Sequence, residues 1–285
     1  MKNTFTDGHI HLLFILFSIV GFSACSTSSP VLQNPTTSAT LWTQNSAEYE
    51  ALTTSIYQNA LSNLGLALED SYWTAYPNQK SDNLRKLPPA VVLDVDETVL
   101  DNSAFQARMI KHNKSFDPKA WNHWVMEANA DAVPGALAFT KIAAQKGITV
   151  IYLTNRDANV EADTRKNLKK LGFPLADNED HILSQHEKPN WTSAKTYRRA
   201  YVASRYRILM FFGDDLNDFT SAKNITQERR HRLVKANQKK WGKKWYVLPN
   251  PVYGSWQSAL YNFNNSLSEK EIDNVKQAKL DTKSN

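Results

Sequence analysis

The chain has 285 residues, of which 41% are hydrophobic and 22% are charged, a composition typical of globular proteins and not of disordered ones. Its length is enough for one large α/β domain, alone or with a modest insertion. The single cysteine excludes an intramolecular disulfide bond, and the formal net charge of +6 suits anionic ligands without indicating nucleic acid.

The first segment is typical of an export signal. Lys2 precedes an apolar run at 12–22 that is too short to span a bilayer, and two small residues then precede Cys25. This arrangement resembles a bacterial lipoprotein signal, in which Cys25 becomes the lipidated first residue. We therefore expect a signal peptide at 1–25 and an exported protein, either an outer-membrane lipoprotein anchored to the membrane by its lipid or a periplasmic protein of a Gram-negative bacterium. An ordinary secretory signal with a coincidental cysteine, or a cytoplasmic protein with an apolar tail, are the alternatives.

The next two segments differ sharply in composition. Residues 26–44 are rich in Ser, Thr, Pro and Gln, which predicts a flexible tether. A helix is then predicted from Asn45 to about Glu69. Four apolar residues share one stripe of this helix: Leu52, Ile56, Ala60 and Leu64.

Strands and helices alternate in the remainder of the chain. Strands are predicted at 90–95, 149–153, 181–183, 208–212 and 245–248, with helices at 135–147, at 159–171 and after Trp191. This alternation implies an α/β fold with a mainly parallel sheet and right-handed crossovers. The aromatic-rich segment 101–133 is long for a βα connection, so we expect a small cap there. The folded domain is thus expected at 45–265, followed by a polar tail at 266–285.

Two carboxylates stand at the carboxyl end of the first predicted strand. Asp94 and Asp96 lie at its carboxyl end, where open α/β sheets place their ligands. Residues two apart in an extended segment share a face, and like charges that close repel unless a cation or a proton lies between them. The pair therefore predicts Mg²⁺ together with acid–base chemistry, with a solvated strand-end cluster as the alternative. A calcium loop is disfavoured, because Val99 stands where its glycine is expected.

Three further segments carry polar groups suited to the same chemistry. Thr154 and Asn155 end the second strand, where a hydroxyl and a backbone N–H at a helix start would bind phosphate oxygens, although Thr154 could equally cap a helix. Lys195 lies on or near the helix before the fourth strand, where a lone lysine usually faces solvent. Asp214 and Asp218 follow the fourth strand and repeat the pattern of the first, with a polar helix-capping turn as the alternative.

In this order the four segments match the haloacid dehalogenase superfamily, and the chain resembles the bacterial class C nonspecific acid phosphatases of its subfamily IIIB. The matching motifs are DVDETVLDNS at 94–103, WNHW at 121–124, AVPG at 132–135, TNR at 154–156, SAK at 193–195, GDDLND at 213–218, LPN at 248–250 and YGSW at 253–256. The resemblance spans roughly residues 45–260. It implies a Rossmann-like core with a mainly parallel sheet plus a small helical cap, and hydrolysis of phosphomonoesters, notably 5′-nucleotides.

The resemblance also implies catalytic and metal-binding roles. Asp94 would attack phosphorus and form an aspartyl-phosphate, and Asp96 would act as general acid and then as general base. Mg²⁺ would be held by the Asp94 carboxylate, the Asp96 backbone carbonyl and Asp214. Asp218 would orient a metal-bound water or Lys195. Asp215 stands where relatives often have asparagine, which leaves its role open.

Substrate contacts follow from the same resemblance. Thr154, the Asn155 N–H and Lys195 would stabilise the phosphoryl oxygens. The faces of Trp121 and Tyr253 would stack on a nucleobase. Two other aromatic residues of the expected cap, Phe105 and Trp124, could also offer ring faces, and packing of the cap onto the core is the alternative for each.

The sequence also bears on other partners and functions. The basic run 229–244 is interspersed with apolar residues, so we expect a solvated helix face and no nucleic-acid partner. The resemblance is compatible with a homodimer. A non-catalytic surface lipoprotein that binds nucleotide or haem on the same fold is the main rival, although a binder would not need both Asp94 and Asp96. A phosphotransferase that passes the phosphoryl group to an alcohol is a second rival.

Overall fold

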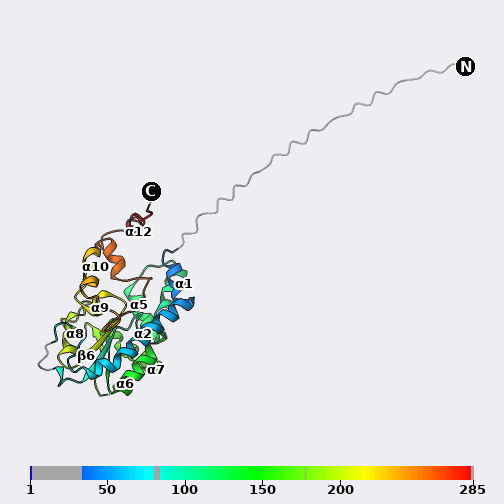
Figure 1. Ribbon diagram of the computed structural model, residues 1–285. Coiled ribbons are helices and arrows are strands. Elements are labelled where there is room, and N and C mark those ends of the chain that lie inside the picture. Colours follow the sequence, from blue (N-terminus) through cyan, green and yellow to red (C-terminus); the bar gives the residue numbers. More distant parts are fainter. Residues whose placement is uncertain (2–33, 80–83, 177, 284–285) are drawn as a thin grey trace. The chain divides into compact units, whose positions relative to one another are not determined.

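The computed structural model describes residues 1, 34–79, 84–176 and 178–283 (Figure 1). The chain divides into two units, Met1–Gln33 and Asn34–Asn285, and every element below belongs to the second. The predicted signal peptide with Cys25, and the tether as far as residue 33, lie outside the described residues.

The second unit alternates strands with helices, as predicted. Its strands are β1 (Pro89–Leu93), β2 (Leu100–Asp101), β3 (Asp131–Ala132), β4 (Thr149–Asp157), β5 (Ile182–Gln185), β6 (Arg207–Gly213) and β7 (Trp245–Val247). Its helices are α1 (Thr37–Asn45), α2 (Ala47–Glu69), α4 (Ser103–Lys111), α5 (Pro118–Glu127), α6 (Ala136–Gln145), the short 3-10 helix η1 (Ala158–Val160), α7 (Glu161–Leu171), α8 (Thr196–Ala203), α9 (Leu216–Phe219), α10 (Gln227–Ala236), α11 (Ser255–Leu260) and α12 (Glu269–Ala278).

The central sheet has five strands in the order β5-β4-β1-β6-β7, and every neighbouring pair is parallel. The α/β fold with a parallel sheet is therefore confirmed. β1 lies in the middle, because Val92 pairs with Ile151 of β4 on one side and with Phe211 of β6 on the other. All carboxyl ends of a parallel sheet meet at one edge, so the polar residues after β1, β4 and β6 are brought together there.

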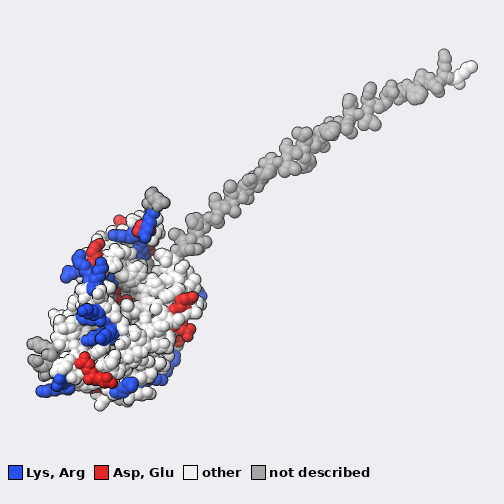
Figure 2. Space-filling view, in the orientation of Figure 1, with Lys and Arg blue, Asp and Glu red and all other residues white. Residues whose placement is uncertain are grey.

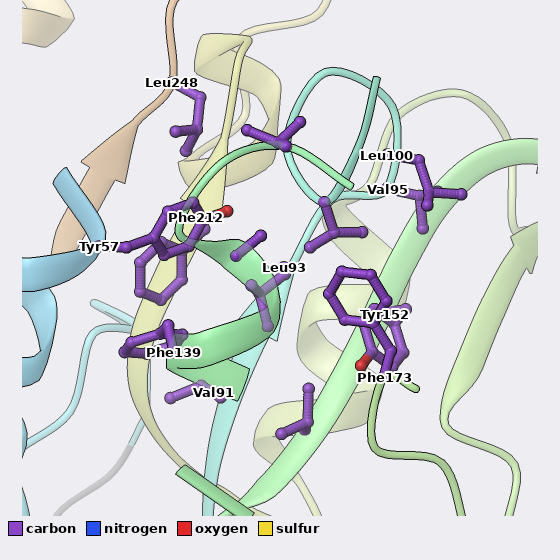
Figure 3. Packing of buried hydrophobic residues seen from close by; sticks show 14 of the residues in the cluster. Tyr57, Val91, Leu93, Val95, Leu100, Phe139, Tyr152, Phe173, Phe212 and Leu248 are labelled. Atoms are coloured by element: carbon purple, nitrogen blue, oxygen red, sulfur yellow. The ribbon is translucent and has the colours of Figure 1, made fainter. Parts of the chain in front are cut away.

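Helices cover both faces of the sheet, which explains why its strands are apolar throughout. Side chains alternate along β1, so Val91 and Leu93 enter one core cluster and Val92 enters the other. In Figure 1, α2, α6 and α7 lie on one side of the sheet and α8 on the other. Figure 3 shows the first cluster, in which the Tyr57 ring stacks on Phe212 with their centroids 5.4 Å apart.

The helix predicted at 45–69 forms as α2, but its buried stripe differs from the prediction. Ser46 caps the helix by accepting a hydrogen bond from the Tyr49 N–H. Leu52 is 43% exposed, and Ile56 is only partly buried. The buried positions are Tyr49, Thr53, Tyr57, Ala60, Leu64 and Ala67. The prediction was wrong in the first half of the helix because tyrosine and threonine, rather than leucine and isoleucine, face the core there.

Two further predicted segments are corrected by the structure. The tether expected at 26–44 contains helix α1 from Thr37, whose Thr40 and Thr43 are buried, so its last part is folded. The tail expected at 266–285 contains α12, which begins with a capping box between Ser268 and Glu271 and has no buried residue. Among the residues that the structure describes, none of the helices combines the length and apolarity needed to cross a bilayer.

The insertion expected at about 101–133 is a small helical subdomain. Its base is the antiparallel pair β2–β3, in which Leu100 lies opposite Ala132 and Asp101 opposite Asp131. Between these strands lie α4 and α5, and Asp117 caps α5 by accepting from the Ala120 N–H. Phe105 and Trp124 are 2% and 3% exposed, so both rings pack inside the insertion.

Candidate active site

Three carboxylates converge at the carboxyl edge of the sheet. Asp94 directly follows β1, Asp214 directly follows β6, and Asp218 lies in the short helix α9. One carboxylate oxygen from each lies within 4.8 Å of the others. The structure therefore brings together the two strand ends that the sequence singled out, and adds Asp218 to the same cluster.

A buried lysine pairs with two of these carboxylates. Lys195 is 2% exposed at the start of α8, and its Nζ donates to Asp218 Oδ1 at 2.6 Å and to Asp94. Burial raises the pKa of Asp94 to about 7; the Lys195 ammonium opposes that shift, while Asp218 and Asp96 add to it. Burial likewise raises the pKa of Asp214 well above its usual range, with repulsion from Asp218 and Asp94 adding to it. Lys195 thus does not neutralise the cluster, which favours binding of a further cation.

Asp96 faces a different set of partners. Its Oδ1 accepts from Arg156 Nε at 2.9 Å and from Asn102 Nδ2 at 3.0 Å, and its Oδ2 has a 3.5 Å contact with the Thr154 hydroxyl. Arg156 and Asn102 are inside the matching sequence motifs, but the sequence alone gave no reason to assign them a contact with Asp96. Both side chains are buried.

The second strand end differs in detail from the prediction. β4 continues through Asp157, where it pairs with Gln185 of β5, so Thr154 and Asn155 lie in the strand and not at a helix start. Thr154 is fully buried and accepts a hydrogen bond from the Arg156 N–H. Asn155 lines the cavity described below, and its side chain donates to the Ser193 carbonyl at 3.2 Å.

The turn after β6 depends on Gly213 and Asp215. A Cβ atom at Gly213 would overlap the Asp218 side chain, so glycine lets this carboxylate approach the strand. Asp215 caps α9 through the Asn217 N–H, and its own N–H donates to Asp218 Oδ2 at 2.9 Å. Asp215 Oδ2 also accepts from the Ser255 N–H at 3.0 Å. Asp215, to which the sequence assigned no role, therefore holds both this turn and the loop that contains Ser255 in place.

The carboxylates open into a cavity of about 690 Å³. Phe116 and Trp121 of the insertion line it, as does Tyr253, whereas Phe105 and Trp124 do not. For these last two rings the packing alternative holds: both are buried, and Phe105 packs edge-on against Trp121, with centroids 5.1 Å apart. Polar residues also line the cavity, among them His186.

Glu97 is a buried acid near the cavity that the sequence did not single out. Its backbone is left-handed, with φ 54°, and its carboxylate accepts from the Asn102 N–H at 3.0 Å and from the Tyr253 hydroxyl. Burial raises its pKa to about 8, with repulsion from Asp96 adding to the shift and the Tyr253 hydrogen bond opposing it. Only its place beside Asp96 in the motif could have drawn attention to it.

The face of the described residues seen in Figure 2 carries no single extended basic patch. On the side seen in Figure 2, Lys and Arg side chains lie in separate groups with acidic and uncharged surface between them. Within the basic run, Arg230 is buried and bonds to Asp215 at 3.3 Å, so part of that charge supports the turn beside the site.

Comparison with known proteins agrees with this architecture. The family model described as HAD superfamily, subfamily IIIB (acid phosphatase) matches residues 24–256. The class C acid phosphatase from Bacillus anthracis, solved with tungstate bound, is 35% identical; the match covers 88% of this chain and 98% of that one, with a TM-score of 0.78. A second structure of that enzyme gives 36% identity and a TM-score of 0.77, over 87% of this chain and 97% of that one.

Plant proteins are more distant relatives. Acid phosphatase 1 of Solanum lycopersicum is 26% identical over 167 residues, 57% of each chain, and the stem 28 kDa glycoprotein of Glycine max is 26% identical over 166 residues, 57% of this chain and 58% of that one. The chain thus spans a little over half the length of these curated relatives. The family model covers most of the chain and the bacterial structures cover nearly all of the folded unit, so the chain belongs to the haloacid dehalogenase superfamily, subfamily IIIB, the acid phosphatase family.

Proposed function

We propose that this protein hydrolyses phosphomonoesters, with 5′-nucleotides as preferred substrates, through an aspartyl-phosphate on Asp94 and with the help of Mg²⁺. The observation that carries the proposal is the convergence of Asp94, Asp214 and Asp218 around one lysine, at the floor of a 690 Å³ cavity. A pure binding protein would not require this set of groups, because several buried carboxylates repel an anionic ligand unless a cation accompanies it.

The donor set fits a hard divalent cation. All three carboxylates supply oxygen, the ligand type that Mg²⁺ prefers, and there is no histidine or cysteine in the cluster of described residues. Asp94 and Asp214 would hold the ion, together with the Asp96 backbone carbonyl. The bound ion would supply positive charge that offsets the repulsion between an anionic nucleophile and an anionic phosphate.

The side chains account for both halves of the reaction. An Asp94 oxygen forms a bond to phosphorus while the bond to the leaving oxygen breaks, and Asp96 gives that oxygen its proton. Asp96 then takes a proton from a water whose oxygen bonds to phosphorus, which releases inorganic phosphate and restores Asp94. Lys195, the Thr154 hydroxyl and the Asn155 N–H would stabilise the phosphoryl oxygens.

Two observations support the choice of substrate. The bacterial relative was solved with tungstate, a tetrahedral oxyanion shaped like phosphate. The cavity is also far larger than a phosphate group needs, and the rings of Trp121 and Tyr253 line it. Stacking of a base on an aromatic ring contributes about 1–3 kcal/mol and tolerates any base, which suits a nucleotidase of broad specificity.

The cellular setting is a separate proposal from the sequence. Small residues before the lone Cys25 support export with lipidation of this residue, which would anchor the protein to a membrane. Growth with labelled fatty acid tests it, because wild type should incorporate label and Cys25→Ser should not.

A release assay tests the activity. The protein should liberate phosphate from a nucleoside monophosphate with Mg²⁺ between pH 5 and 7, and a chelator should stop it. Asp214→Asn should need a higher Mg²⁺ concentration for half-maximal rate. Binding of nucleotide without release would favour the binding-protein alternative, and phosphorylation of an added alcohol would reveal phosphotransfer.

A further inference from the structure

The two oxygens of Asp96 lie in unequal surroundings. Oδ1 accepts from Arg156 Nε at 2.9 Å and from Asn102 Nδ2 at 3.0 Å, and Arg156 Nη2 also lies 2.9 Å from it. Oδ2 has one long contact among the described residues, 3.5 Å to the Thr154 hydroxyl. Because Oδ1 already accepts hydrogen bonds from two residues, a proton on this oxygen is disfavoured. Oδ2 is therefore the oxygen available to carry the proton.

The orientation of the Asn102 amide is set by its neighbours. Its Oδ1 accepts from Trp124 Nε1 at 2.8 Å and from Arg156 Nη2 at 3.1 Å, so its amino group has to face Asp96. Asn102, Arg156 and Trp124 are 0%, 1% and 3% exposed, which shields this arrangement from water. A buried network in which each member is paired holds its groups in one geometry.

Arg156 also ties the insertion to the core. Its Nη1 donates to the Thr164 hydroxyl of α7 at 3.3 Å, and its guanidinium lies over the Trp121 ring, 5.7 Å from the centroid. Trp124 and Trp121 both come from α5, whereas Arg156 comes from β4. The insertion therefore reaches Asp96 through two routes, one by each tryptophan.

We propose that Asn102, Arg156 and Trp124 are positioning residues that anchor Oδ1 of Asp96 and leave Oδ2 as the oxygen that delivers the proton to the leaving group. This inference rests on the proposed function, since it requires Asp96 to act as the general acid. Oδ2 lies 3.5 Å from the hydroxyl of Thr154, a residue proposed above to bind the phosphoryl group.

Dependence on the leaving group distinguishes positioning from a merely structural role. A p-nitrophenolate ion leaves without a proton, whereas an alkoxide requires one. The value of kcat/KM includes only the steps through phosphoryl transfer to Asp94, so it isolates the acid role of Asp96 from its later role as base. A mispositioned general acid should therefore lower kcat/KM more for alkyl phosphates than for aryl phosphates.

The test compares kcat/KM for p-nitrophenyl phosphate and for glycerol 2-phosphate in wild type, Arg156→Lys, Asn102→Leu and Trp124→Phe. A positioned general acid contributes about 10²- to 10⁴-fold, so Asn102→Leu should lose at least roughly tenfold more on the alkyl ester than on the aryl ester. Trp124→Phe removes the N–H that donates to Asn102 but keeps an aromatic ring, although a smaller one, so a smaller loss of the same selectivity is expected. Arg108→Gln is the matched control, because Arg108 lies over the Trp124 ring, 4.8 Å from the centroid, and has no contact with Asn102 or Asp96.

The test distinguishes failure of the proposed function from failure of the positioning role. Wild type inactive on both esters would refute the proposed function itself. An active wild type with equal losses on both esters, or with no loss in Trp124→Phe and Arg156→Lys, would overturn the positioning role. Should Asn102→Leu fail to fold, as judged by thermal unfolding, the Trp124→Phe and Arg156→Lys comparisons decide the question alone.

Discussion

Lys195 Nζ donates to Asp218 Oδ1 at 2.6 Å, and the same ammonium contacts Asp94. One lysine from the start of α8 therefore joins the strand end of β1 to the turn after β6. A buried ammonium paired with two carboxylates is fixed in direction, which is what a group that stabilises a transferring phosphoryl oxygen needs.

Replacement of this lysine should therefore impair catalysis more than folding. We expect Lys195→Met to lower kcat/KM for a nucleoside monophosphate by roughly 100-fold or more, the loss typical of one preorganised electrostatic contact. Steady-state kinetics at saturating Mg²⁺ measure it. Lys166→Met, at an exposed position of α7, is the matched control and should retain the wild-type rate. A Lys195→Met enzyme within a few-fold of wild type would remove this residue from the mechanism.

The sequence allowed prediction of the sheet because its strands are short apolar runs with distinct ends. β1 and β6 are buried on both faces and therefore apolar, so the carboxylates that directly follow them, Asp94 and Asp214, could be recognised from the sequence. Helix α1 could not be predicted, because the polar composition of 26–44 masks two buried threonines, Thr40 and Thr43.

The contacts of Asp96 were equally beyond prediction. Asp96 accepts from Asn102 and Arg156, and Trp124 in turn bonds to Asn102. These positions are separated in sequence and meet only after the insertion folds onto β4. The aromatic residues of the insertion illustrate the same limit. Composition alone could not tell that Phe105 packs inward whereas Trp121 lines the cavity.

The close approach of Asp218 to β6 predicts a steric effect at Gly213. Gly213→Ala should displace the Asp218 side chain, because the added methyl group would overlap it, and activity should fall at least tenfold. Gly65→Ala is the matched control: apart from its chain neighbours and its own helix backbone, no atom lies within 4 Å of the added Cβ, and the change should stabilise α2 by up to about 1 kcal/mol. Thermal unfolding and kinetics on both variants check this, and full activity in Gly213→Ala would contradict the described turn.

The buried carboxylates predict an unusual pH dependence for the metal-free protein. Burial raises the pKa of Asp94 from 3.8 to about 7 and that of Glu97 from 4.5 to about 8. Between about pH 4 and 8 the native state therefore binds more protons than the unfolded state, so stability should fall as pH rises. We expect Tm in a chelator to be several degrees lower at pH 8 than at pH 5, and Mg²⁺ to reverse the loss because it binds the ionised carboxylates.

Asp94→Asn provides the control for this titration. Since the amide has no charge to bury, the variant should show a smaller fall in Tm between the two pH values. A metal-free wild type that is more stable at pH 8 than at pH 5 would contradict the assigned pKa directions.

The Tyr253 ring that lines the cavity predicts an effect on KM that is specific to nucleotides. Tyr253→Ala should raise KM for a nucleoside monophosphate by about tenfold or more, the equivalent of roughly one stacking contact, and should change KM for glycerol 2-phosphate little. Tyr253→Phe keeps the ring and loses only the hydroxyl that donates to Glu97, so its KM should stay near wild type. Equal increases for both substrates in Tyr253→Ala would refute a stacking role.

The proposed mechanism requires above all that Asp94 acts as the nucleophile beside a bound divalent ion. The most direct measurement is phosphate release from a nucleoside monophosphate by wild type and Asp94→Asn, each with Mg²⁺ and with a chelator. We expect release by wild type with Mg²⁺ only and a loss of at least roughly 10³-fold in Asp94→Asn. Release by Asp94→Asn at a rate near that of wild type would contradict it.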